Sequence, residues 1–348
     1  MVEKKELLSV FQQLRKTLEL LIANETWPGF ESGITESEFT QFKTAIAKEQ
    51  LHNPWFTPEN YYKALRGIVH LLEPVGLEEF SNRYTYANKQ KRVAIIMAGN
   101  IPFVGFHDLL CVLLAGHHAI CKLSSSDARI PLLIIQLLQQ WNTNLKERIS
   151  VSVGPLKAYD AVIATGSNAT IQQLESYFSH VPRVFRRNRT SVAILNGQET
   201  DDELRRLGED CFDFFGLGCR NVSKLYVPKD FNLNRLFENF SGQSSWINHH
   251  KYGNNYDYNR TVYLMNQIPF LDNNAFMLKE DSGLHAPLSV IYYEKYESLD
   301  KTIAKIESLS DELQAIVGAG FVPFGKAQSP DIHDFADGFD TCKWLNNI

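Results

Sequence analysis

The stretch KRVAIIMAGNIPFVG (91–105) decides how the rest of the chain is interpreted. KRVAIIMAG is a short, apolar, β-prone run that ends in glycine, which is typical of a buried strand. IPFVGFHDLLCVLLAGH (101–117) follows with apolar residues at helical spacing. A strand, a glycine-containing turn and a helix in this order predict a βα unit of a parallel sheet.

The same alternation continues after this unit. The predicted strands are HAICKL (118–123), ISVSVGP (149–155), DAVIATG (160–166), RVFRR (183–187) and SVAILNG (191–197). The predicted helices are DARIPLLIIQLLQQW (127–141) and NATIQQLESYF (168–178), the second with Asn168 as its N-cap. The pattern predicts a doubly wound, Rossmann-type sheet, which binds its ligand at the carboxyl ends of the strands. Two glycine turns lie there, MAGNIPFVG (97–105) and ATGSNAT (164–170).

The composition shifts suggest four parts. Residues 1–90 are predicted to be largely helical and to pack on a nucleotide-binding domain at 91–197. A smaller α/β catalytic domain follows at 198–325, and a tail at 326–348 returns to the core or to an oligomer interface. In the smaller domain we expect helices at 201–216 and 297–309, and a long polar loop at 241–260. Its strand candidates are SKLYVP (223–228), RTVYLMN (260–266), FMLKED (276–281) and PLSVIYYEKY (287–296).

Bulk properties exclude several classes of function. The 348 residues carry a net charge of −5 that is spread out, so no basic face for nucleic acid is predicted. No segment reaches the roughly 18 apolar residues of a membrane span. The N-terminal residues carry charges at helical spacing and lack the apolar run of a signal peptide, which predicts a cytoplasmic location.

The five cysteines are an odd number with irregular spacing and no CxxC, which argues against a disulfide framework and a structural zinc site. Cys219 stands out because it follows Gly216 and Gly218 and precedes a strand, with Arg220 and Lys224 nearby. Glycines let a tight turn expose a side chain, and cations favour the reactive thiolate. The alternative is that Cys219 is a small buried hydrophobe, as most lone cysteines are.

Adjacent histidines at 249 and 250 have no further ligand at a metal spacing, so we predict surface loop residues and no metal site.

Six segments occur in the order found in the aldehyde dehydrogenase superfamily. They are MAGNIP (97–102), ICKLSSSD (120–127), ATGS (164–167), FGLGCRNVSKLYVP (215–228), HAPLSVIYYEKYESLDKTIAKI (285–306) and VPFG (322–325). FRRNRTSVAILNG (185–197) and the segment from Gly320 to Leu345 resemble, more narrowly, the LuxC-type fatty acyl-CoA reductases of the bioluminescence branch. The resemblance covers about residues 90–348 and implies an aldehyde-dehydrogenase-like α/β fold.

The resemblance implies roles for individual residues. Cys219 matches the nucleophile that forms a thioester with the acyl group, and Asn100 matches the asparagine that holds the oxyanion together with the cysteine's own amide. Lys122 matches the lysine that binds the adenosine ribose of the nicotinamide cofactor. Gly166 and Ser167 match the turn near the pyrophosphate. The resemblance also implies a homo-oligomer, a dimer or larger.

The sequence departs from the superfamily at several positions. Ile194 in ILNG stands where hydrolytic members carry a water-activating glutamate, and the nearby Glu199 is out of register. Ser125 stands where NAD-preferring relatives carry an acid, which favours NADPH and leaves NADH as an alternative. In GSNATI, Ile171 replaces the usual second glycine. Glu280 is the nearest candidate for the glutamate that binds the nicotinamide ribose, although its spacing from the following motif differs.

The sequence therefore predicts an NADPH-dependent reductase that converts acyl-CoA, with a fatty acyl group, to an aldehyde through a thioester on Cys219. Without a base to activate water, the thioester is expected to await hydride, since general bases contribute roughly 10²–10⁴-fold. Three alternatives stay open: a reductase of an acyl phosphate, an aldehyde dehydrogenase that forms the acid, and a nucleotide-binding scaffold with a degenerate site.

Overall fold

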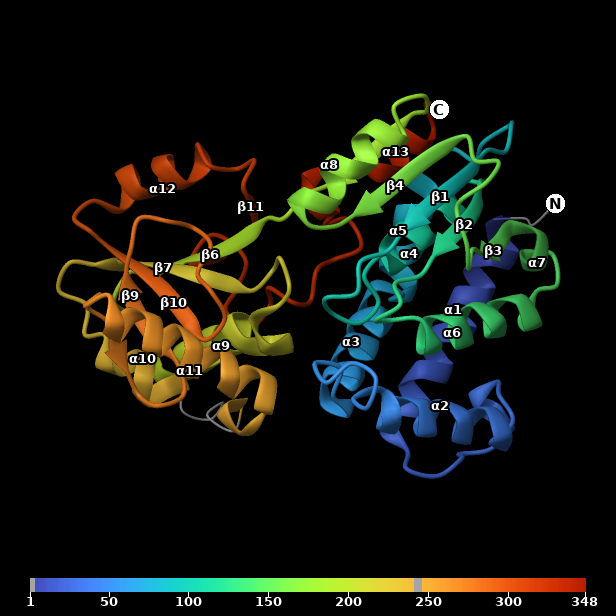
Figure 1. Cartoon of the computed structure of the whole chain (residues 1–348). Helices are drawn as coiled ribbons and strands as arrows, with labels where there is room; N and C mark the ends of the chain where they lie inside the picture. The colour runs from blue at the N-terminus through green and yellow to red at the C-terminus, as the bar shows by residue number, and fades with distance from the viewer. Residues whose placement is uncertain (1–3, 241–245) are drawn as a thin grey trace. The chain divides into compact units, whose positions relative to one another are not determined.

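The computed structural model describes residues 4–240 and 246–348. The chain forms two compact units (Figure 1). The first unit combines the residues up to Arg187 with 330–348, and the second unit spans 188–329. The sequence patterns placed comparable borders at 197 and 325, so the structure puts one additional strand, at 190–194, into the second unit.

Helices fill the first part of the first unit, as predicted. They are α1 (Lys4–Ala23), α2 (Glu36–Glu49), α3 (Pro58–Leu71) and α4 (Pro74–Arg83), with a short 3₁₀ turn at Phe30–Ser32. The side chain of Thr35 caps α2 in a reciprocal capping box with Glu38, and Thr57 caps α3, whose first residue is Pro58.

A five-stranded parallel sheet follows, in the order β3-β2-β1-β4-β5. The strands are β1 (Arg92–Ile96), β2 (His118–Lys122), β3 (Ile149–Val151), β4 (Ala161–Thr165) and β5 (Arg183–Arg186). The connecting helices are α5 (Phe106–Leu114), α6 (Arg129–Trp141), α7 (Leu145–Arg148) and α8 (Asn168–Tyr177). The predicted doubly wound sheet is confirmed. The predicted N-cap is wrong by one residue, because Ser167, not Asn168, accepts the hydrogen bond from the Thr170 amide.

Both faces of this sheet are covered, which explains why its strands are almost wholly apolar. Val93 and Ile95 of β1 point into a large core shared with α1 and the other N-terminal helices. Ala94 points to the other face, where Ile171 of α8 closes a second, smaller core. Figure 1 shows α8 on one side of the sheet and α1, α2 and α6 on the other.

The C-terminal tail returns to the first unit. Its helix α13 (Thr341–Leu345) buries Cys342 and Leu345 in the large core. Arg186, at the end of β5, is buried, and its guanidinium pairs with the Asp108 carboxylate and donates to the Thr341 hydroxyl over 2.8 Å. The tail is therefore fixed by apolar packing and by a buried polar cluster.

The second unit contains a six-stranded sheet in the order β11-β6-β7-β10-β9-β8, parallel except for β8 against β9. The strands are β6 (Thr190–Ile194), β7 (Val222–Pro228), β8 (Leu271–Asp272), β9 (Met277–Glu280), β10 (Val290–Tyr296) and β11 (Leu313–Gly318). The helices are α9 (Asp201–Phe212), α10 (Asn234–Asn239), α11 (His250–Met265) and α12 (Leu299–Glu307), with a 3₁₀ turn at Asp213–Gly216.

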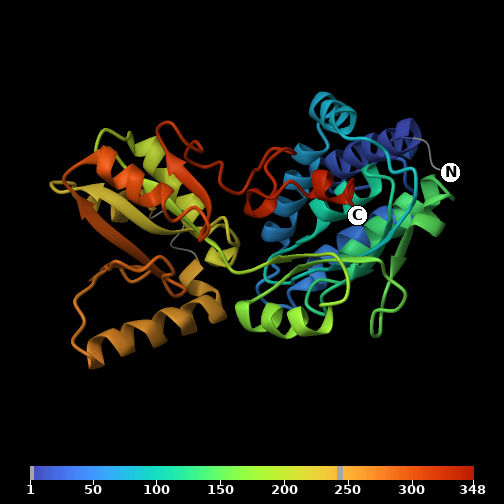
Figure 2. The ribbon, with the colours of Figure 1, turned by 90° about the horizontal axis from the view of Figure 1, so that it is seen from above.

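Helices α11 and α12 pack on the same face of the second sheet, because Tyr226 pairs in register with Glu294 of β10 and Val290 lies four residues earlier on that strand. Ile306 of α12 packs with Ile194 and Tyr226. The long helix α11, drawn in orange in Figure 2, packs through Tyr256 and Tyr263 on Met277 and Val290.

Helix α11 corrects two predictions. The expected loop at 241–260 and the expected strand at 260–266 are wrong where they overlap α11 (residues 241–245 lie outside the described residues). Asparagines, tyrosines and Gly253 give this segment poor helix propensity. Tertiary packing compensates, because the buried Tyr252, Tyr256, Asn259 and Tyr263 recur every three or four residues along one face.

Within residues 4–240 and 246–348, no helix combines the length and the apolar character needed to cross a membrane.

Candidate functional site

Five of the predicted site residues follow three neighbouring strands of the first sheet. Asn100 follows β1, Lys122 ends β2 with Ser125 three residues on, and Gly166 and Ser167 follow β4. These strands are adjacent in the order β2-β1-β4. The chain winds from β1 towards β3 on one side and from β4 to β5 on the other, so β1 and β4 flank the topological switch point. Ligands of such sheets bind at the carboxyl edge at this point.

The Lys122 ammonium is oriented by the loop after β3. It donates to the carbonyl oxygens of Val153 and Gly154 over 3.2 and 3.0 Å. An ammonium has three donors, so the two carbonyls fix its position without using all of its hydrogen-bonding capacity. Ser125 is exposed at the tip of the neighbouring loop.

A buried carboxylate joins the loop of Ser125 to the loop of Asn100. Asp127 accepts hydrogen bonds from the Tyr61 hydroxyl (2.6 Å) and from the Phe103 amide (2.7 Å). Phe103 has a φ of 63°, a left-handed conformation that costs energy for a bulky residue, so the Asp127 bond helps to hold it. Burial raises the pKa of Asp127 to about 6, against the lowering effect of both hydrogen bonds.

The two loops also touch at Gly99. A Cβ on Gly99 would lie 2.3 Å from the Ser124 hydroxyl oxygen, so only glycine permits this approach. The loop of Asn100 is thus fitted against the loop of Ser125.

The turn after β4 opens α8. The Ser167 side chain caps the helix, and Ile171, fully buried, anchors its first turn on the sheet. The first-turn amides of such a helix favour anions, as the resemblance implies for a pyrophosphate. Ile171 at the place of a glycine therefore contributes packing between helix and sheet.

In the second unit, Cys219 is the exposed cysteine of five, and none of the five is in a disulfide. Burial raises the pKa of Cys121 to about 12 and the pKa values of Cys111 and Cys211 well above the usual range. These three therefore stay neutral thiols and serve as packing residues. Exposure singles out Cys219 as the candidate nucleophile.

The chain reaches Cys219 through a strained segment. Phe214, Phe215 and Gly216 have consecutive φ values of 53°, 59° and 77°, in the left-handed region. Non-glycine residues persist there only when their surroundings hold them. Both phenylalanines are buried, and the Phe215 ring stacks on His249 with ring centres 4.4 Å apart.

His249 is the N-cap of α11, not a surface loop residue as predicted, and its Nδ1 accepts from the Tyr252 amide. His250 is the first residue of the helix. One histidine therefore supports both the helix start and the strained segment.

Hydrogen bonds fix the turn around Cys219. The buried Asn221 accepts from the Gly218 amide through Oδ1 (2.7 Å), and its own amide donates to the Gly218 carbonyl oxygen (3.0 Å). The Asn221 Nδ2 donates to the carbonyl oxygens of Asp210 (3.1 Å) and Asp213 (2.9 Å), at the end of α9. The Ser191 hydroxyl, on β6, donates to the Cys219 carbonyl oxygen over 3.0 Å.

A second buried aspartate, Asp210 on α9, supports this turn. The Asp210 carboxylate accepts from the amides of Gly325 (2.7 Å) and Ala327 (2.9 Å). Burial raises its pKa to about 7, although both hydrogen bonds act in the opposite direction. Asp210 thereby joins the segment around VPFG to the helix end that holds Asn221.

Lys224 is not the free cation beside Cys219 that its position in the sequence suggested. Its side chain is fully buried, and its ammonium binds the Glu294 carboxylate (2.8 Å) and the Ser282 carbonyl oxygen (2.9 Å). Burial lowers its pKa, while Glu294 acts against that. Its charge is therefore largely neutralised inside the sheet, and Arg220 remains the cation next to Cys219 in sequence.

The hypothesis that Ile194 marks the place of a missing base beside Cys219 is wrong. In the parallel register, Ser191 pairs with Val222 and Ile194 pairs with Tyr226. Cys219 precedes Val222 by three residues, so it lies at the amino end of β7, whereas Ile194 lies at the carboxyl end of β6. Ile194 is buried against α12 and has no bearing on water at Cys219.

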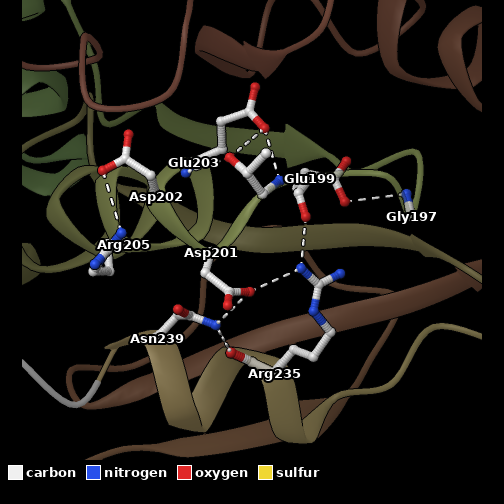
Figure 3. A network of polar contacts seen from close by, with 9 residues as sticks. Gly197, Glu199, Asp201, Asp202, Glu203, Arg205, Arg235 and Asn239 are labelled. Carbon is white, nitrogen blue, oxygen red and sulfur yellow. Dashed lines mark hydrogen bonds and ion pairs between the residues drawn. The ribbon is translucent and has the colours of Figure 1, made fainter.

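Glu199 follows Ile194 in the loop at the carboxyl end of β6. Its carboxylate accepts from the amides of Asn196 (2.6 Å) and Gly197 (3.1 Å). Figure 3 shows it closing this turn while Arg235 binds the Glu199 carbonyl oxygen and the Asp201 carboxylate. Glu199 also lines an open cleft of about 460 Å³ at the carboxyl ends of β6 and β11. It supports the start of α9 and does not replace a base at Cys219.

Glu280 is exposed at the end of β9. It pairs in register with Tyr293, which pairs with Leu225 of β7. Leu225 lies six residues after Cys219, so Glu280 and Cys219 stand at different levels of the sheet, two strands apart. The role of Glu280 towards a nicotinamide ribose stays a prediction.

The predicted site residues are thus divided between the two units. Asn100, Lys122, Ser125, Gly166 and Ser167 share the carboxyl edge of the first sheet, while Cys219 and Glu280 belong to the second unit. Three supporting residues were missed: Asp127, Ser191 and Asn221. Asn221 carried a usable signal, because an asparagine after Gly-Cys-Arg is typical of a side chain that bonds its own turn. Ser191 and Asp127 act across the fold, and no local pattern identifies them.

Comparisons with known proteins agree with this architecture. The family model for acyl-CoA reductase (LuxC) matches residues 34–238, more than half of the chain. A comparison with curated proteins found no match.

Solved structures share the fold at low sequence identity. Aldehyde dehydrogenase 21 from Physcomitrella patens, in complex with the reaction product succinate, is similar with a TM-score of 0.59 and 11% identity over 91% of this chain and 78% of that one. A Mycobacterium tuberculosis aldehyde dehydrogenase complexed with NAD+ has a TM-score of 0.59 and 11% identity over 86% and 70%. A 3,6-anhydro-L-galactose dehydrogenase in complex with NAP has a TM-score of 0.56 and 12% identity over 90% and 76%. The predicted aldehyde-dehydrogenase-like fold is confirmed.

Proposed function

Because the chain belongs to the LuxC family of acyl-CoA reductases, and is therefore an aldehyde-forming oxidoreductase, we propose that it reduces a fatty acyl-CoA to the aldehyde with NADPH. The observation that carries the proposal is Cys219, which is exposed on a turn braced by Ser191 and Asn221. In this proposal the second unit supplies the nucleophile, and the carboxyl edge of the first sheet binds the cofactor.

The first step is transfer of the acyl group. The Cys219 thiolate attacks the carbonyl carbon of the acyl-CoA, and a carbon–sulfur bond forms as the carbonyl oxygen becomes an oxyanion. The Cys219 amide and the Asn100 side chain would donate to this oxyanion, a contact worth about 2.7–4 kcal/mol per donor. The oxyanion then collapses, the bond to the CoA sulfur breaks, and CoA leaves as a thiolate that takes up a proton. A thioester on Cys219 remains.

The second step needs a hydride, which bound NADPH supplies. The switch point between β1 and β4 fits a dinucleotide, with the capped α8 beside Gly166 for the pyrophosphate and the fixed Lys122 ammonium for the ribose. The Asn100 and Cys219 donors would hold the oxygen of the thiohemiacetal that results. Its collapse releases the aldehyde and restores the Cys219 thiolate.

Two features support the choice of cofactor and product. Ser125, exposed next to the ribose lysine, carries no charge that would repel a 2′-phosphate. Family membership, rather than Ile194, now supports reduction over hydrolysis. The cytoplasmic location and the homo-oligomeric state stay predictions.

The test combines two measurements on one preparation. The protein is mixed with acyl-CoAs of graded chain length, and free CoA thiol is followed with and without NADPH. We expect one equivalent of CoA release without NADPH and continued release, with loss of NADPH absorbance, when NADPH is present. Cys219→Ala should abolish both, whereas Cys211→Ala, a buried cysteine on α9, should retain both.

Turnover with an acyl phosphate but with no acyl-CoA would replace the proposal by the acyl phosphate alternative. Nucleotide binding without any acylation would support the scaffold alternative. Full activity of the Cys219→Ala variant would show that Cys219 is not the nucleophile.

A further inference from the structure

The peptide groups on both sides of Cys219 are held by named partners. The Gly218 carbonyl oxygen, in the peptide that precedes Cys219, accepts from the Asn221 amide over 3.0 Å. The Cys219 carbonyl oxygen, in the peptide that follows, accepts from the Ser191 hydroxyl over 3.0 Å. Two fixed peptide planes leave the backbone at Cys219 a single orientation, and with it the direction of its Cα–Cβ bond.

The orientation of the Cys219 amide follows from this arrangement. In a trans peptide the N–H and the C=O point in opposite directions. The Gly218 carbonyl points at the Asn221 amide, so the Cys219 N–H points away from Asn221. Asn221 therefore determines which way the amide next to the thiol faces.

Asn221 is itself immobilised on all sides. It is 3% exposed, its Oδ1 binds the Gly218 amide, and its Nδ2 binds the carbonyl oxygens of Asp210 and Asp213. These carbonyls belong to the end of α9 and the residue after it, groups that a helix leaves without intrahelical partners. The turn is thus fastened to a helix end and, through fully buried Ser191, to the neighbouring strand β6.

We propose that Asn221 and Ser191 are positioning residues that aim the Cys219 amide at the oxyanion formed during acyl transfer. This inference rests on the proposed function in one respect, that Cys219 is acylated. Neither residue touches the reacting atoms, and both act through the peptide groups that flank Cys219. The effect should therefore be confined to reactions that pass through an oxyanion.

Two reagents separate positioning from general damage to the turn. p-Nitrophenyl acetate and acyl-CoA acylate a cysteine through an oxyanion, whereas iodoacetamide alkylates the same sulfur without one. The rate of each reaction at Cys219 is measured at one pH for the wild-type protein and each variant. Nitrophenolate release, CoA release and mass spectrometry of the alkylated peptide report the three rates.

We expect Asn221→Ala to slow both acylations by about 100-fold, the scale of losing one oxyanion donor. Alkylation should change by less than about threefold, because it does not use the Cys219 amide. Ser191→Ala should slow acylation by about fivefold, which corresponds to about 1 kcal/mol, the scale of one lost hydrogen bond. Ser191→Thr keeps the hydroxyl and should recover most of that loss.

Ser223→Ala is the matched control. Its hydroxyl contacts the Thr190 hydroxyl on β6 (2.6 Å) and the carbonyl oxygen of Leu284 in the loop between β9 and β10 (2.5 Å), and neither partner belongs to the Cys219 turn. Acylation should be unchanged in this variant. Thermal unfolding of each variant checks folding, and Ser191→Ala decides the question if Asn221→Ala does not fold.

The outcomes distinguish the two proposals. A wild-type protein that is alkylated but acylated by neither donor overturns the proposed function. A wild-type protein that is acylated, with variants that lose acylation and alkylation in equal proportion or lose neither, overturns the positioning role alone.

Discussion

Asp127 in the first unit and Asp210 in the second support candidate functional loops in the same way but with different partners. Each carboxylate is buried and accepts two hydrogen bonds. Asp127 binds the Tyr61 hydroxyl and the Phe103 amide, whereas Asp210 binds two backbone amides, of Gly325 and Ala327. A hydroxyl can donate or accept, and a backbone amide can only donate. An asparagine in place of Asp127 could therefore keep both hydrogen bonds, whereas an asparagine in place of Asp210 could keep only one of them.

The largest expected effect is the pH dependence of stability. Burial raises the pKa of Asp210 to about 7 and that of Asp127 to about 6, whereas an unfolded aspartate has a pKa of about 3.9. Between these values the folded protein binds protons that the unfolded chain has released. The free energy of unfolding should therefore fall as pH rises from about 4 to about 7, by up to about 1.4 kcal/mol per pH unit for each group. Asp210 alone should contribute on the order of 4 kcal/mol over its window.

Urea unfolding at a series of pH values measures this slope. Asp210→Asn should flatten the dependence, most clearly above pH 6, where more than half of the Asp127 carboxyls have lost their proton. Asp311→Asn, an exposed aspartate, serves as control and should keep the wild-type slope. A variant at Asp210 with the full wild-type slope would contradict this origin of the pH dependence.

The next effect compares the same substitution at both aspartates. Asp210→Asn brings an amide NH₂ against the Gly325 or Ala327 amide, so one buried donor loses its acceptor. We expect a loss of about 1–3 kcal/mol in the free energy of unfolding. Asp127→Asn can accept from the Phe103 amide and donate to the Tyr61 oxygen, so it should lose less than about 1 kcal/mol. Urea unfolding at pH 8, where both wild-type carboxylates are ionised, is the measurement. Equal losses of unfolding free energy in the two variants would show that the Tyr61 hydroxyl does not change from donor to acceptor in Asp127→Asn.

The sequence predicted the parts of the fold that depend on local pattern. The strand, turn and helix at 91–117 and the turn at 164–170 were confirmed because apolar periodicity and glycines determine them. Helix α11 was missed because its stability comes from tyrosines packed on β9 and β10, not from its propensity. The assignment of Ile194 failed because a motif comparison ignores strand direction, and the parallel register places it at the wrong end of the sheet.

The candidate site shows the same division. Cys219 was identified from its own glycine turn, whereas the bonds that hold it come from Ser191, 28 residues earlier, and from the end of α9. Such contacts depend on the packing of distant segments. No sequence pattern around Cys219 could indicate the contacts with Ser191 and α9, although Asn221 could be expected to bond within its own turn.

A smaller effect is expected for Tyr61→Phe. The substitution removes the donor to one Asp127 oxygen and keeps the ring, so it should lower stability by about 1–2 kcal/mol. Because Asp127 joins the loops of Ser125 and Asn100, we expect a higher KM for NADPH at an unchanged rate of Cys219 alkylation by iodoacetamide. Tyr62→Phe is the matched control, since the Tyr62 hydroxyl contacts only the Lys43 side chain among the described hydrogen bonds. If KM for NADPH changes equally in both variants, the hydrogen bond between Tyr61 and Asp127 does not influence cofactor binding.

The smallest expected effect concerns Ser125, whose loop Asp127 holds in place. Ser125→Glu puts a carboxylate on an exposed loop tip, where it can accept from the ribose hydroxyls of NADH and repel the 2′-phosphate of NADPH. The ratio of kcat/KM for NADPH to that for NADH should fall about tenfold, which corresponds to about 1.4 kcal/mol. Ser125→Gln has the same size without the charge and should keep a ratio close to that of the wild type. Raising the salt concentration should narrow the gap between the two variants, because exposed charges are screened over a Debye length of about 10 Å at 0.1 M. If Ser125→Glu and Ser125→Gln shift the ratio equally, the loop selects the cofactor by shape, and the charge at this position plays no part.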